Sequence, residues 1–252
     1  MQLAEMNWCQ VAALSKDTPL VFPVAAVEQH GHHLPLYTDS FLLGEIVRRV
    51  EVAVGDRIAL APLQWLGNSD HHLDFPGTLS APPRSYLDLL GALIENGLMH
   101  GFRRIVFLNG HGGNDVPGRQ AVFEARQRHR QRSDLLLLFA TYWQLADLGT
   151  DDASKFRQSQ MGHACEWETS MILRLNPRWV GKIDALEPVE HRGAFEPASR
   201  AWITKDITVK GHIGEPSAAT AEKGEILFRT FAEGAVRMLE RVVAWDGRSW
   251  KG

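Results

Sequence analysis

The sequence predicts an α/β fold with a parallel central sheet. Four short runs are almost continuously apolar, as expected of strands buried on both faces, and segments with helical periodicity separate them. Alternation of this kind is typical of parallel sheets with right-handed crossovers. Because no repeat, low-complexity tract or charge block interrupts the 252 residues, we expect one domain over 1–252.

Each element has a local signal. Apolar runs predict strands within 19–27, 57–64, 103–110 and 134–143. Apolar residues at helical spacing predict intervening helices over 42–54 and 86–98, a third from about residue 114, and a closing helix from about residue 220. Pro117 suits the first turn of the third helix, and Thr220 suits the cap of the last.

Composition excludes several classes of protein. With 27 Lys and Arg against 30 Asp and Glu, the chain has no basic excess that would attract nucleic acid or an anionic membrane. No signal peptide is evident at the start, and the longest apolar run, LLLLFA, is too short to span a bilayer. Two cysteines exclude a disulfide framework and fit a reducing compartment. We therefore expect a cytoplasmic protein.

Polar side chains gather where the predicted strands end. In strand order, these residues are Glu28 and His30; Ser69, His71 and His72; His111 of NGHGGN; and Trp143. Because ligands of open α/β sheets bind outside the carboxyl ends of the strands, we expect these residues to meet at one edge.

The same residues suggest a metal centre. Glu28 and His30 lie two apart, so in an extended segment they point to the same side. A chain reversal could bring Asp39 back from the start of the next helix, and His111 arrives from a neighbouring strand. Carboxylates with imidazoles suit Zn²⁺, Mn²⁺ or Fe²⁺, and a shared Asp39 would create a two-metal hydrolytic centre. The alternative makes Asp39 a helix cap and the histidines ordinary loop residues.

The glycine-rich turn NGHGGN has two interpretations. Gly112 would let a substrate approach the backbone beside His111, so we interpret the turn as a ligand-binding element. Phosphate binding on its N–H groups is the alternative, although the turn matches neither a P-loop nor the dinucleotide fingerprint.

Five segments resemble the motifs of one known family. In chain order they are PVAAVEQHGHHLPLYTDS, HHLDFPGTLS, NGHGGN, GHACEWETSMIL and GEPSAATAEKGEIL. Together they resemble the creatininase (creatinine amidohydrolase) family. The resemblance implies a three-layer α/β/α fold with a mainly parallel sheet, a two-metal centre that hydrolyses C–N bonds of cyclic or unusual amides with a metal-activated water, and a homo-oligomer, which is a hexamer in creatininase.

The resemblance also assigns roles to residues. It implies that Glu28, His30, Asp39 and His111 are metal ligands, that Asp39 bridges the two ions, and that His163 is the catalytic histidine that protonates the leaving nitrogen.

Three departures limit what is carried over. Creatininases have Tyr and a metal-binding Glu after the motif histidine, where this chain has Gly112 and Gly113; they also have a tryptophan where Ser159 stands, so creatinine is not the expected substrate. We expect Glu168 to replace the missing ligand, with Glu166 as the weaker candidate. On one regular helix His163 and Glu168 would point about 140° apart, so we expect His163 in the loop before the helix, which Gly162 permits.

The sequence therefore predicts a metal-dependent amidohydrolase for a small cyclic amide or a related amide or formamide. It would hold two divalent ions, Zn²⁺ before Mn²⁺ or Fe²⁺. We expect Ser69, His72, Gly112 and Trp143 to contact the substrate; the alternatives are that His72 braces a loop and Trp143 packs in the core. Alternative functions are formamidopyrimidine-nucleotide deformylation, mycofactocin-type peptide cleavage, and metal or small-molecule binding without turnover.

Overall fold

A computed structural model describes residues 1–190, 195 and 197–249 and shows one four-stranded sheet. The strands are β1 (Leu20–Val24), β2 (Ala59–Leu60), β3 (Arg104–Asn109) and β4 (Leu136–Thr141). They lie in the order β2-β1-β3-β4, and every neighbouring pair is parallel. The predicted parallel α/β fold is thus confirmed.

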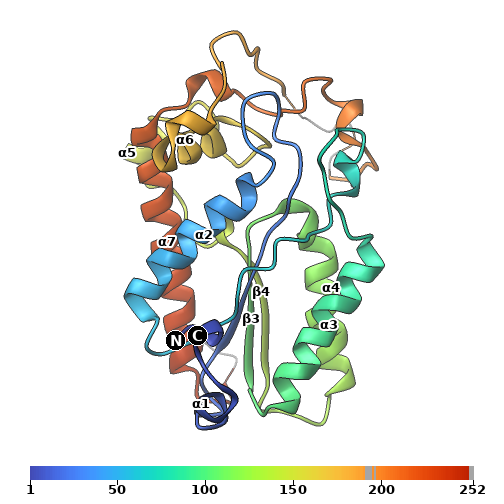
Figure 1. Ribbon diagram of the computed structural model, residues 1–252, viewed down its shortest axis with the longest axis vertical. Helices are drawn as coiled ribbons and strands as arrows, with labels where there is room; N and C mark the ends of the chain where they lie inside the picture. The colour runs from blue at the N-terminus through green and yellow to red at the C-terminus, as the bar shows by residue number, and fades with distance from the viewer. Residues whose placement is uncertain (191–194, 196, 250–252) are drawn as a thin grey trace.

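Two helical layers cover the sheet (Figure 1). Helices α2 (Thr38–Val54), α6 (Glu166–Leu175) and α7 (Ala221–Ala244) share one core with one face of the sheet. Helices α3 (Pro83–Met99) and α4 (Asp115–Arg128) share a second core with the other face. The three layers implied by the resemblance are therefore present.

Short elements connect these layers. They are α1 (Trp8–Ala12), α5 (Thr150–Ala153) and the 3₁₀ helices η1 (Leu3–Glu5), η2 (Asp70–His72), η3 (Gly112–Asn114), η4 (Tyr142–Gln144), η5 (Pro177–Trp179), η6 (Thr204–Asp206) and η7 (Pro216–Ala218). No helix within the described ranges is long and apolar enough to cross a membrane.

Strand β2 is much shorter than its apolar run predicts. Ala59 and Ala61 donate to β1 in regular alternation, but the next donor is Gln64 rather than residue 63, so the regular register ends after Ala61. Beyond it, Gln64 exchanges backbone hydrogen bonds with Pro23 and Ala25. The chain therefore still follows β1 to its carboxyl end, where it turns into η2.

The helix starts agree with their sequence signals. Helix α4 begins at Asp115 and has Pro117 in its first turn. Helix α7 begins after Thr220, whose hydroxyl accepts a hydrogen bond from the N–H of Lys223 at 3.2 Å.

Candidate metal centre and catalytic site

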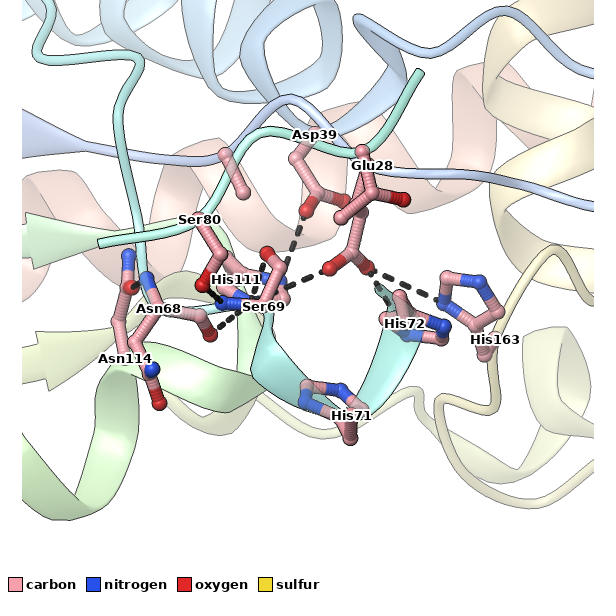
Figure 2. A network of polar contacts seen from close by, with 12 residues as sticks. Glu28, Asp39, Asn68, Ser69, His71, His72, Ser80, His111, Asn114 and His163 are labelled. Atoms are coloured by element: carbon pink, nitrogen blue, oxygen red, sulfur yellow. Dashed lines mark hydrogen bonds and ion pairs between the residues drawn. The ribbon is translucent and has the colours of Figure 1, made fainter. Parts of the chain in front are cut away.

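Six predicted site residues come together at the carboxyl ends of the strands. Glu28 and His30 follow β1, Asp39 lies in the first turn of α2, His111 follows β3, His163 precedes α6, and Glu168 lies in the first turn of α6. Five of these side chains are buried, and that of His163 is 14% exposed. Figure 2 shows His111 on one side of Glu28 and His163 on the other.

Asp39 contacts two imidazoles with its two oxygens. Its Oδ1 lies 3.1 Å from His30 Nε2, and its Oδ2 lies 2.9 Å from His111 Nδ1. A carboxylate that faces a different nitrogen with each oxygen has the geometry needed to bridge two ions. The bridging role of Asp39 stays a prediction, with this geometry in its favour.

The other two carboxylates complete the cluster. Glu28 Oε2 lies 3.4 Å from His111 Nε2, whereas Oε1 lies 3.4 Å from both His72 Nε2 and His163 Nδ1. Glu168 Oε1 lies 3.6 Å from His30 Nε2. Carboxylates and imidazoles therefore alternate through the cluster.

Backbone carbonyls determine which nitrogen of three histidines carries hydrogen. His30 Nδ1 donates to Glu28 O at 3.1 Å, His111 Nε2 donates to Asn68 O at 2.9 Å, and His163 Nε2 donates to Gln29 O at 2.8 Å. A carbonyl oxygen only accepts, so in the neutral ring the opposite nitrogen presents a lone pair. These lone pairs face the oxygens of Asp39, Glu168 and Glu28.

A lone pair facing a carboxylate requires a cation between them, either a proton or a metal ion. Three buried carboxylate oxygens, Glu28 Oε2, Asp39 Oδ2 and Glu168 Oε2, also have no hydrogen-bond donor within the described part of the chain. Leaving such groups unpaired is costly. Sets of three ligand atoms lie within 4.8 Å of one another, including Glu28, His30 and Asp39. These residues fit divalent metal ions with carbonyl-anchored imidazole ligands.

The pKa values show how the cluster behaves without a cation. Burial raises the pKa of Glu28 to about 7. Burial opposes the charged form of His111, but the carboxylates of Glu28 and Asp39 outweigh it and raise the pKa of His111 to about 9. Burial likewise opposes charge on Asp39, yet His30 and His111 hold its pKa well below the usual range. Without metal, the cluster therefore retains protons near neutral pH.

Glu166 and Glu168 have different surroundings. Glu166 is fully buried and accepts hydrogen bonds from Lys223 Nζ and from the N–H groups of Arg157 and Gln158. Its oxygens are therefore engaged away from the cluster, whereas Glu168 faces His30. The geometry favours Glu168 as the replacement ligand, which stays a prediction.

His163 lies before α6, in the loop where we expected it. Its backbone N–H and C=O pair with Ile213 at 2.9 and 2.7 Å. A Cβ on Gly162 would come within 2.3 Å of Ile213 O, so glycine permits this close pairing. The pairing brings His163 to the same cluster as Glu168.

The four predicted substrate contacts differ in position. Ser69 Oγ lies 3.2 Å from His111 Nε2, and His72 Nδ1 lies 2.7 Å from Thr204 Oγ1, so His72 both faces Glu28 and braces a loop. Gly112 is exposed, with open space beside its Cα. Trp143 packs edge-on against Tyr142 among the half-buried residues of the core. This position fits the alternative expectation, in which Trp143 packs in the core.

Two cluster residues were given no role from the sequence: His71 was expected only at this edge, and Gln29 was not expected there. His71 stacks parallel to His111, with ring centroids 6.0 Å apart and an interplanar angle of 10°. Gln29 Nε2 donates to Gly211 O at 2.9 Å and lies within 3.0 Å of His72 and His163 nitrogens. His71 adjoins His72 in the same loop, which is a usable signal. Gln29 offers none, because strand alternation would point it away from its neighbours.

Comparison with known proteins agrees with this geometry. The family model described as creatinine amidohydrolase matches residues 4–239. The chain belongs to the creatininase family. It is 30% identical to the mycofactocin precursor peptide peptidase of Mycobacterium tuberculosis, over 96% of this chain and 92% of that protein. It is 26% identical to the creatinine amidohydrolase of Pseudomonas putida, over 92% and 93%.

A solved structure of a creatininase with manganese is also similar to this creatininase-family chain. The two share 26% sequence identity and a TM-score of 0.78, over 95% of this chain and 97% of the other. The similarity extends across the sheet and both helical layers.

Proposed function

We propose that this creatininase-family protein is a metal-dependent amidohydrolase that cleaves a C–N bond of a small cyclic amide or a related amide or formamide. One observation carries the proposal: three imidazoles are anchored on backbone carbonyls and direct their lone pairs at buried carboxylates. If the cluster had only a structural role, apolar side chains could pack in its place at a lower cost in free energy.

The residues divide into two ligand groups that share Asp39. His111 lies against one Asp39 oxygen, and His30, with Glu168 beside it, lies against the other. Glu28 lies near both histidines. Zn²⁺ or Mn²⁺ held there would polarise the amide carbonyl and lower the pKa of water. The manganese of the similar creatininase supports this choice of metals.

His163 is placed to move a proton. Burial and the nearby His30 lower its pKa well below the usual value, so the ring is neutral at neutral pH. Gln29 O holds the hydrogen on Nε2, which leaves Nδ1 as the basic atom facing the cluster. In the proposed reaction, His163 Nδ1 accepts the proton of the attacking water and then donates it to the leaving nitrogen.

A peptide substrate is the second candidate. Gly112 is exposed with open space beside it, so an extended chain could run along the backbone next to His111. The 30% identity to a peptide peptidase supports the same candidate. A panel that compares cyclic amides, formamides and short peptide amides would separate the two substrate classes.

The proposal is tested by metal content per chain, measured by mass spectrometry. We expect about two ions in the wild type, one for each ligand group, and about one in Glu168→Gln. The matched control is Glu222→Gln, which removes an exposed carboxylate in the first turn of α7 and should leave both ions in place. A wild type that binds neither Zn²⁺ nor Mn²⁺ would refute the metal-dependent mechanism.

A further inference from the structure

The carbonyl that anchors His111 belongs to Asn68, and a second asparagine holds it there. Asn68 N–H donates to Asn114 Oδ1 at 2.9 Å. Asn114 Nδ2 in turn donates to Ala25 O at 3.0 Å and to Asn109 Oδ1 at 3.2 Å. Both asparagines are buried, and Figure 2 shows them side by side next to His111. The loop after β2 is thus tied to the ends of β1 and β3.

The Asn68 carbonyl, at 2.9 Å, is the nearest acceptor to His111 Nε2, and Glu28 Oε2 lies farther away at 3.4 Å. Ser69 Oγ also lies 3.2 Å from His111 Nε2, but a hydroxyl can donate or accept and therefore suits either tautomer. The carbonyl at 2.9 Å accepts only, so it requires hydrogen on Nε2 and leaves Nδ1 for a ligand beside Asp39.

Gly113 provides the space for this carbonyl. A Cβ built on Gly113 would lie 2.1 Å from Asn68 O and 2.5 Å from His111 Nε2. The neighbouring Gly112 has nothing within 4 Å of the same position. Space therefore restricts residue 113, whereas residue 112 is unrestricted. Any side chain at 113, including the glutamate of the creatininase motif, would therefore force the carbonyl or the His111 ring to shift.

We propose that Asn68 and Asn114 position His111 for metal binding through Nδ1, and that Gly113 is required because it lets the Asn68 carbonyl reach Nε2. Residue 113 therefore cannot both supply an acidic ligand and leave space for the carbonyl that anchors His111. This inference rests on the proposed metal-dependent function. Because outer partners of this kind typically change metal affinity by 10–100-fold, the effect is measurable without a substrate.

Four variants in two matched pairs test the proposal. Gly113→Ala forces the carbonyl away, whereas Gly112→Ala adds the same methyl group to open space. Asn114→Ala removes the acceptor of the Asn68 N–H, whereas Asn96→Ala removes an exposed side-chain amide near the end of α3. Zn²⁺ dissociation constants are measured by competition with a chelator on folded protein. We expect about 10–100-fold weaker binding for the first member of each pair and unchanged binding for the second.

A spectroscopic readout separates positioning from general loss of stability. In the zinc-loaded, ¹⁵N-histidine-labelled protein, long-range ¹H–¹⁵N spectra should show His111 with hydrogen on Nε2 in the wild type, Gly112→Ala and Asn96→Ala. The signal is assigned by its absence in His111→Asn. We expect this signature to be lost in Gly113→Ala and Asn114→Ala.

Each outcome decides something definite. Wild-type protein with hydrogen on Nδ1 of His111, or equal zinc affinity within both pairs, would overturn the positioning role and leave the proposed function standing. Wild-type protein that binds no zinc would overturn both. Weaker zinc binding in Gly113→Ala and Asn114→Ala together with an unaltered tautomer would also overturn the positioning role, because the carbonyl would then not determine the tautomer of His111.

Discussion

At the scale of single residues, His163 is the group whose protonation matters most for the proposed reaction. Its Nε2 is bound to Gln29 O and its Nδ1 lies 3.4 Å from Glu28 Oε1. The sequence-based expectation made it a donor to the leaving nitrogen. The lowered pKa adds an earlier step, because a neutral ring must first accept the proton that it later donates.

His163→Gln should therefore lower kcat by about 10²–10⁴-fold, since that is the usual contribution of a positioned acid or base. The measurement is steady-state kinetics on the best amide of the panel, with metal content determined in parallel. The exposed His100, changed to Gln, is the control and should retain the wild-type rate. Loss of metal in His163→Gln would instead assign His163 to the ligands.

The sequence predicted the residue types of the site but not how their atoms are used. Glu28, His30, Asp39 and His111 stand at predicted strand and helix ends, so their approach could be anticipated. Which nitrogen of each histidine faces inward could not be anticipated. The carbonyls of Glu28, Gln29 and Asn68 decide it, and backbone carbonyls carry no signal in the sequence.

At the scale of elements, the contact between α6 and α7 holds in place the segment that leads into His163. Glu166 is fully buried and pairs with Lys223, and it also accepts the N–H groups of Arg157 and Gln158. Gln158 Oε1 in turn accepts from the N–H groups of Glu166 and Glu215. One buried carboxylate thus connects both helices to the segment that leads into His163.

Lys223→Met should destabilise the protein by about 3–5 kcal/mol, because it leaves the buried charge of Glu166 without its partner. Urea unfolding of the metal-free protein measures this change. The matched control is Arg174→Met, which breaks the exposed pair with Glu225 between the same two helices and should cost at most about 1 kcal/mol. Equal losses in the two variants would contradict the structural role assigned to Lys223.

Helices were easier to predict from sequence than strand lengths. Helical periodicity and the signals at Pro117 and Thr220 located α4 and α7 closely, since these signals are local. Strand β2 has only two residues, because its length depends on its register with β1, which changes between Ala61 and Gln64. The apolar run over 57–64 nevertheless predicted which segment reaches the site, since the chain beyond β2 carries Ser69, His71 and His72 there.

At the scale of the whole molecule, the site joins parts that are far apart in the sequence. Side chains from α2, from α6 and from the segments that follow β1 and β3 contribute carboxylates or imidazoles to one buried cluster. Metal ions bound there would connect α2 and α6 of one helical layer to the segments that follow β1 and β3, so metal binding and folding should be coupled. The homo-oligomer expected from the family resemblance stays a prediction that sedimentation velocity would check.

This coupling should depend on pH. In the metal-free protein, burial raises the pKa of Glu28 from 4.5 to about 7, and carboxylates raise that of His111 from 6.5 to about 9. The folded state therefore binds protons more tightly than the unfolded state. The stability that these two groups contribute is present at low pH and is lost as pH rises through about 7 and then about 9. Metal ions compete with the same protons, so their affinity should rise over that interval.

We therefore expect the Tm difference between zinc-loaded and chelator-treated protein to widen from about pH 6.5 to about pH 8.5. Each kcal/mol of stability gained corresponds to about 2–4 °C for a chain of this size. His33 and His71, whose pKa values burial lowers to about 4, respond mainly below this interval. Glu28→Gln should flatten the pH dependence of the metal-free protein, because an amide has no proton to lose. A Tm difference that stays constant or narrows would show that the cluster does not exchange protons for metal.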